Sequence, residues 1–180
     1  MGPLTYSLCN KLGLAQLAIP FCAFPPLFLN QPVTLTAGHT TSISAFVVPV
    51  SKKYPLALTF EFESNQARLS DEIVGSNGHD ENCRANRPYE SIPESKRAGL
   101  GRSIPLQVVI RKSSDQSVVV DKVFHSLCVS SHDGGRKKTR EVAWLDLVEG
   151  EYTAAVTSLV EQPGLQNVST RISLYSGERK

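Results

Sequence analysis

The stretch Pro55-Leu-Ala-Leu-Thr-Phe-Glu-Phe-Glu63 decides the fold class, because large apolar side chains alternate in it with small, polar or charged ones. Alternation with a period of two residues is typical of a β-strand that buries one face. Leu56, Leu58, Phe60 and Phe62 share one side of this strand. We therefore predict a half-buried strand with these four residues in the core.

The same alternation recurs along the chain, between clusters of turn-forming residues. Short turns such as Glu149-Gly150 join several of these segments, and the helical crossovers that parallel strands need are absent. The pattern predicts an all-β fold, an antiparallel immunoglobulin-like or jelly-roll-type β-sandwich of about eight strands. The further strands are expected at Val33–Ala37, Ser42–Val50, Ile104–Lys112, Ser117–Phe124, Glu141–Val148, Glu151–Val160 and Val168–Ser176.

One region, residues 65–102, breaks the strand pattern. A short helix is predicted near Arg68–Val74, stopped by Gly75, and a long polar stretch, Ser76–Arg102, follows it. A long loop in a compact domain is often functional. This insertion is therefore the first place where we expect a binding site, the alternative being a solvated loop without a partner.

The aromatic residues of WLDLVEGEY add to the sandwich prediction. Tyr152 opens a strand after a glycine turn, as in the tyrosine corner of immunoglobulin-like domains, or it is simply a core aromatic residue. Trp144 is expected in the core. The predicted core also includes Leu106, Val108 and Ile110.

Length, net charge and motifs reduce the number of function classes that suit the chain. The chain has 180 residues and a net charge of +2, which suits one domain and gives no overall field for nucleic acid. No Gly-x-Ser-x-Gly motif and no Gly-rich loop opening a helix is present. We therefore expect a protein that is not an enzyme and needs no cofactor.

The N-terminal segment, residues 1–30, differs from the rest. Leu12–Leu29 is almost wholly apolar and follows Lys11, which resembles an export leader. A membrane-embedded tail and an apolar extension along a sheet edge are the alternatives. We expect one sandwich domain over residues 31–180, located in the periplasm or envelope, with membrane contact only through this segment if it is not cleaved.

The cysteines leave three readings open. Cys83 and Cys128 would form a disulfide in an oxidising compartment. Together with His79 and His132 they have a ligand set that suits tetrahedral zinc. Two free thiols are the third reading, and we favour the disulfide over the metal site.

Arg136-Lys-Lys-Thr-Arg140 is the densest run of charge. It follows Asp133-Gly-Gly135 and precedes a predicted strand, so it is expected to rim a solvated hairpin loop. Because no aromatic residues interleave with the cations, it does not resemble a platform for single-stranded nucleic acid. Contact with an acidic partner is the functional alternative. In that case Arg136, Lys137, Lys138 and Arg140 would steer association.

The order of segments resembles a proteobacterial family of small exported proteins, often lipoproteins, known only as a domain of unknown function. The resemblance is carried by Thr36–Ser64, Arg68–Gly75, Ile104–Lys112 and Leu145–Leu159. It implies a β-sandwich and supplies no catalytic residues.

We predict a non-enzymatic envelope module that binds another protein, in the manner of an immunity protein that masks an antibacterial effector such as a secreted toxin or lipase. Arg84, Arg87 and Tyr89 of the insertion combine apolar bodies with polar tips and are the expected contacts. The alternative is a sandwich that binds glycans or another small ligand, which would need exposed aromatic residues on one face.

Overall fold

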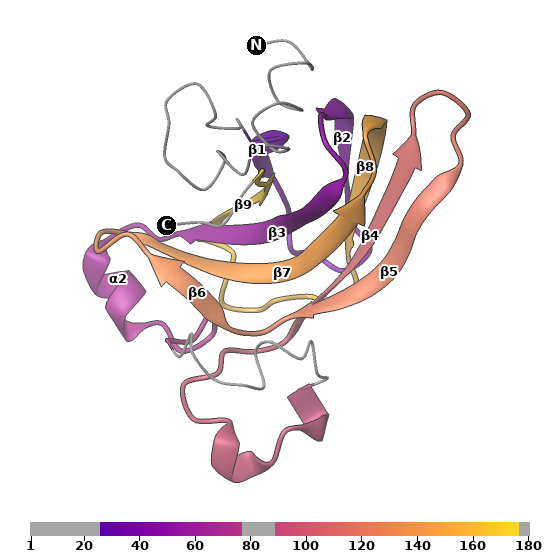
Figure 1. Ribbon diagram of the computed structural model, residues 1–180. Helices are drawn as coiled ribbons and strands as arrows, with labels where there is room; N and C mark the ends of the chain where they lie inside the picture. Colours follow the sequence, from indigo (N-terminus) through magenta and orange to yellow (C-terminus); the bar gives the residue numbers. More distant parts are fainter. Residues whose placement is uncertain (1–25, 77–88, 177–180) are drawn as a thin grey trace.

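The computed structural model describes residues 26–76 and 89–176, and these fold into two antiparallel sheets packed face to face (Figure 1). One sheet has the strand order β1-β9-β3-β7-β6, and the other has the order β2-β8-β4-β5. The all-β sandwich with one short helix is confirmed. The nine strands are β1 (Phe28–Pro32), β2 (Thr40–Val48), β3 (Lys52–Glu61), β4 (Ile104–Lys112), β5 (Val118–Ser126), β6 (Val129–His132), β7 (Lys137–Leu147), β8 (Gly150–Ser158) and β9 (Ser169–Leu174).

Two strand predictions differ from the structure. The first strand lies earlier than Val33–Ala37, because Phe28–Pro32 pairs with β9. The four-residue strand β6 was not predicted, since Val129–His132 is too short to show a period. It pairs with β7 and completes the edge of the five-stranded sheet.

The core lies between the sheets and contains the predicted side chains. All of Leu56, Leu58, Phe60, Phe62, Leu106, Val108 and Ile110 are buried there. Their neighbours along each strand point to the outer faces of the sheets, as period-two alternation requires.

Two tyrosines join the sheets at the turns where the chain crosses from one to the other. Tyr152 donates its hydroxyl hydrogen bond to the carbonyl of Val148 at 2.9 Å, and Tyr54 does the same to Val50 at 2.5 Å. Both rings belong to the buried core. The tyrosine-corner reading of Tyr152 therefore fits, and Tyr54 forms the corresponding contact at the β2–β3 turn.

The helix α2 (Asn65–Ser70) is shorter than expected and begins earlier. Ser64 caps it by accepting a hydrogen bond from the Ala67 amide at 3.1 Å. Two 3-10 helices, η3 (Tyr89–Ser91) and η4 (Glu94–Lys96), follow before β4. In Figure 1, α2 lies beside β6, whereas the segment with η3 and η4 lies below the sandwich. No helix in the described ranges is long and apolar enough to span a membrane.

Candidate functional site

The basic run of β7 does not form one solvated rim. Arg136 and Lys137 are exposed, and both pair with Glu61, at 3.1 and 3.8 Å. Lys138 and Arg140 instead keep only 4% and 0% of their surface exposed. The expected solvated position is therefore wrong for these two, because a β-bulge in β7 opposite Leu56 and Ala57 reverses the alternation and turns them toward the interior, next to Phe62 and Phe60.

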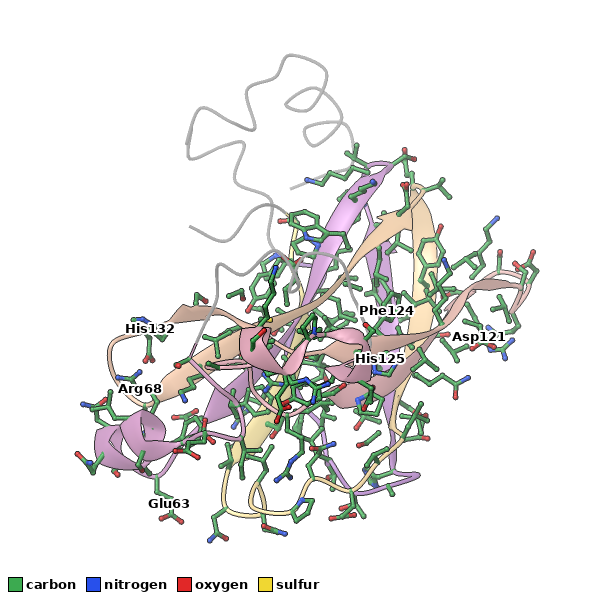
Figure 2. All side chains as sticks on the ribbon, turned by 90° about the horizontal axis from the view of Figure 1, so that it is seen from below. Glu63, Arg68, Asp121, Phe124, His125 and His132 are labelled. Carbon is green, nitrogen blue, oxygen red and sulfur yellow. The ribbon has the colours of Figure 1, made fainter. Side chains whose placement is uncertain are left out.

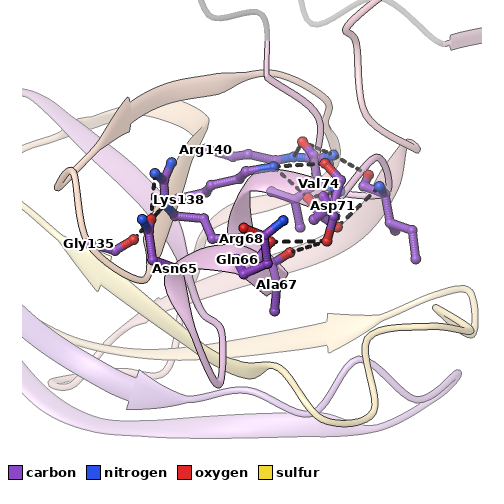
Figure 3. A network of polar contacts seen from close by, with 11 residues as sticks. Asn65, Gln66, Ala67, Arg68, Asp71, Val74, Gly135, Lys138 and Arg140 are labelled. Carbon is purple, nitrogen blue, oxygen red and sulfur yellow. Dashed lines mark hydrogen bonds and ion pairs between the residues drawn. The ribbon is translucent and has the colours of Figure 1, made fainter.

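Arg140 holds the segment after α2 onto the sandwich (Figure 3). Its Nε atom and one terminal nitrogen donate to the carbonyl of Val74 at 3.0 and 2.7 Å. The terminal nitrogens also donate to the carbonyls of Ile73, Arg102 and Ser126 at 2.8–2.9 Å. Five hydrogen bonds thus match the five donors of the guanidinium.

The charge of Arg140 persists at neutral pH. Burial lowers the pKa of Arg140 to about 9, and the negative charge of Asp71 opposes this shift. A group with that pKa remains protonated near pH 7. The carbonyl oxygens around it therefore face a cation, and the contact is structural.

Lys138 makes a second buried attachment to the same segment. Its ammonium group lies 2.7 Å from a carboxylate oxygen of Asp71, and both side chains are 6% exposed. Asp71 also accepts hydrogen bonds from the amides of Ile73 and Val74. Lys138 and Arg140 together fix the backbone of residues 71–74, so both are removed from the predicted partner contacts.

The insertion has its own small core. Ile92, Leu100, Leu127 and Cys128 are buried together, and Tyr89 packs against them. Arg97 lies over the Tyr89 ring at 4.7 Å and donates to the carbonyl of Ile92 at 2.8 Å. This part of the insertion is therefore folded, and Tyr89 has a packing role besides its predicted role in binding.

Cys128 is disulfide-bonded. Cys83, Arg84 and Arg87 lie outside the described residues, so the pairing of Cys83 with Cys128 and both arginine contacts stay predictions. Peptide mapping without reduction checks the pairing. Within the described ranges, no three His, Cys, Asp or Glu side chains are grouped so that they could hold a metal ion.

The surface that the sequence reasoning missed is the outer face of the five-stranded sheet, around Trp144. The Trp144 side chain is 44% exposed, so its expected core position is wrong. Trp144 is opposite Pro55 in the neighbouring strand, and the amide of Tyr175 donates to the Pro55 carbonyl at 3.0 Å. Alternation places Trp144 and Tyr175 on the same outer face, on either side of Pro55.

Polar residues surround this aromatic pair. Lys53 and Asp146 are opposite each other on one side, and Glu141 lies on the other side, next to the small residue Ala57. Lys137, paired with Glu61, lies on the same face further along β7. We define the Trp144 face as the exposed residues Lys53, Glu141, Trp144 and Asp146 together with the half-buried Tyr175. Pro55, Ala57 and Ser173 lie on the same side of the sheet but are buried.

Figure 2 labels side chains in two other regions of the domain. Glu63 and Arg68 lie at the α2 end, and Asp121, Phe124 and His125 lie along β5. Arg68 is buried and donates to the Gly135 carbonyl at 2.6 Å, which ties α2 to the β6–β7 hairpin. Asp121 accepts from the Gln107 side chain at 2.9 Å. These contacts connect neighbouring elements of the domain.

Comparison with known proteins places the chain in a family. A model described as a domain of unknown function, DUF5625, matches residues 30–176. The chain belongs to the DUF5625 family. The matched range includes both sheets, Arg140 and Trp144. This confirms the resemblance to a family of unknown function, whereas the proteobacterial origin and lipoprotein nature stay predictions.

Among solved structures, a protein from Sulfurospirillum deleyianum is similar, with a TM-score of 0.55 and 14% sequence identity. The match covers 82% of this chain and 96% of that chain. At this identity the likeness shows a shared fold alone. No curated protein matches the sequence.

Proposed function

We propose that this DUF5625 protein is a non-enzymatic module of the bacterial envelope that binds another protein through the Trp144 face. The observation that carries the proposal is the 44% exposed Trp144 on a sheet face where the exposed charges of Lys53, Glu141 and Asp146 surround it. Large aromatic residues are enriched at interface centres, and polar rims surround them.

Two observations support the further details of the proposal. The disulfide at Cys128 suits an oxidising compartment such as the periplasm, to which an N-terminal leader would direct the chain. Arg136 and Lys137 are exposed at the end of the Trp144 face and would steer an acidic partner. The specific form that we propose is an immunity-type protein that masks a secreted toxin or lipase effector.

The test is binding of the product of a neighbouring gene to purified wild-type protein and to the Trp144→Ala variant. Loss of an interface anchor worth about 2 kcal/mol raises Kd about 30-fold. The matched control is Val47→Ala, because Val47 is 60% exposed on the other sheet. It is expected to change Kd less than about twofold, since isolated exposed residues contribute little.

Trp144 is the only tryptophan of the chain, so its fluorescence also reports on the proposed surface. Burial in a complex is expected to shift its emission to shorter wavelength. Two results together would place the interface elsewhere: Trp144 emission that does not change when a tight complex forms, and a Kd of the Trp144→Ala variant that equals the Kd of the wild type.

A second candidate function, glycan binding, is favoured by the position of Trp144 and Tyr175 on one face. With one strand between them, their backbones lie about 10 Å apart. The exposed Trp144 ring would stack against the apolar face of a sugar, with the half-buried Tyr175 beside it on the same face. Titration of Trp144 fluorescence with soluble β-linked oligosaccharides tests this function, and a saturable change that Tyr175→Ala weakens is the expected result.

A further inference from the structure

A pocket of about 430 Å³ lies between α2 and the turn that precedes β9. Apolar groups form much of its surface, with Phe62 buried and Ala67, Ile73 and Val168 half-buried. Its volume is within the range of sites that take a small molecule or one large side chain. The residues that line it are Phe62, Glu63, Ala67, Ser70, Asp71, Glu72, Ile73, Gly164, Asn167 and Val168.

The charge around this pocket is negative and only partly compensated. Asp71 is neutralised by Lys138 at 2.7 Å. Glu63 and Glu72 are exposed, and no ion pair within residues 26–76 and 89–176 involves either carboxylate. The pocket therefore combines apolar walls with two carboxylates that are available to a cation.

We propose that this pocket receives a lysine or arginine side chain of the partner protein. Such a side chain has an aliphatic stem that suits Phe62 and Ala67, and a cationic head that suits Glu63 and Glu72. A neutral group would gain only uncharged hydrogen bonds from the two carboxylates, and an acidic group would be repelled by them. The inference rests on the proposed function, because it names the chemistry that a protein partner presents.

The first experiment uses butylguanidinium as a probe of the isolated full-length protein. Methyl NMR signals of Ala67, Ile73 and Val168 are followed during titration. We expect saturable shifts, and about fivefold weaker binding of the neutral analogue butylurea, since each exposed pair contributes up to that factor. The Glu63→Gln/Glu72→Gln variant should bind both probes equally, whereas the control Glu149→Gln should behave as wild type.

The second experiment measures partner affinity with the same variants. Glu63→Gln/Glu72→Gln is expected to weaken partner binding at least fivefold at low salt, and Glu149→Gln is expected to leave it unchanged. Equal binding of the two probes by wild-type protein would overturn the inference. So would a partner affinity that the double variant does not change, and in that case binding that still depends on Trp144 would leave the proposed function intact.

Discussion

Substitution of Arg140 by methionine should detach residues 71–76 and 99–102 from the sandwich. Methionine keeps the length of the side chain and its contact with Phe60, but it removes every hydrogen-bond donor. The carbonyls of Ile73, Val74, Arg102 and Ser126 would then lose their shared partner. The main chain cannot be replaced, so no compensating apolar substitution exists for these acceptors.

The expected loss of unfolding free energy is about 3–5 kcal/mol. Breaking a buried charged contact by removing one partner costs this much, and each orphaned polar group costs about 1–3 kcal/mol before water reaches it. Arg140→Lys should lose less, because an ammonium group keeps the charge and three donors but cannot span four carbonyls.

Urea denaturation followed by far-ultraviolet circular dichroism measures the loss, with the disulfide of Cys128 kept oxidised. Hydrogen exchange adds a local reading: the amides of Ser76 and Arg102, which donate to Gly99 and Ile73, should lose protection before those of the central strands. A loss below about 1 kcal/mol, with unchanged protection of both amides, would refute the assigned role of Arg140.

Three further predictions concern stability. Phe60→Ala should cost about 3–5 kcal/mol in urea denaturation, because Phe60 is fully buried, and a loss below about 1 kcal/mol would contradict its core position. Gly101→Ala should destabilise the protein strongly in thermal melting, since a Cβ atom there would lie 1.9 Å from a guanidinium nitrogen and 2.4 Å from a backbone oxygen, whereas Gly135→Ala should be nearly neutral. Burial, and to a lesser extent Glu149, raises the pKa of Tyr54 to about 12, so the folded state favours the neutral phenol. The resulting contribution to the free energy of unfolding is complete below pH 10 and is lost as the pH rises toward 12. Unfolding of Tyr54→Phe across this range should show a smaller fall in stability than the wild type, and an equal fall would count against the assignment.

The strands could be predicted from the sequence because apolar and polar residues alternate several times along each long strand. Ile104–Lys112 was predicted with the bounds that the structure has. The short strand β6 offers too few residues for such a pattern, and only its pairing with β7 defines it. Element ends elsewhere differ by a few residues, because pairing partners, and not local preference, set where each strand begins.

Trp144 shows how a correct pattern can be misread. In Trp144-Leu-Asp-Leu147 the tryptophan shares its strand side with Asp146, and that side is the outer face. The hydrophobicity of Trp144 argued for the core, whereas its phase relative to Leu145 and Leu147 argued for the surface. The phase was the better signal, because a strand cannot turn one side chain inward without a bulge.

Lys138 and Arg140 are charged residues whose burial could not be predicted from the sequence. Both have the phase of Trp144 and Asp146, which predicts the outer face, and charged side chains are rarely buried without a partner. A β-bulge in β7, opposite Leu56 and Ala57, reverses the alternation and turns both side chains inward. Their partners are Asp71 and a set of main-chain carbonyls far away in the sequence. Local sequence patterns do not indicate such long-range contacts. Burial of these two cations leaves Arg136 and Lys137 as the exposed part of the run, beside Glu61 on the outer face of the same sheet as Trp144. The charges available for recognition are therefore fewer than the sequence suggests, but they lie on the sheet face where the exposed aromatic residue is.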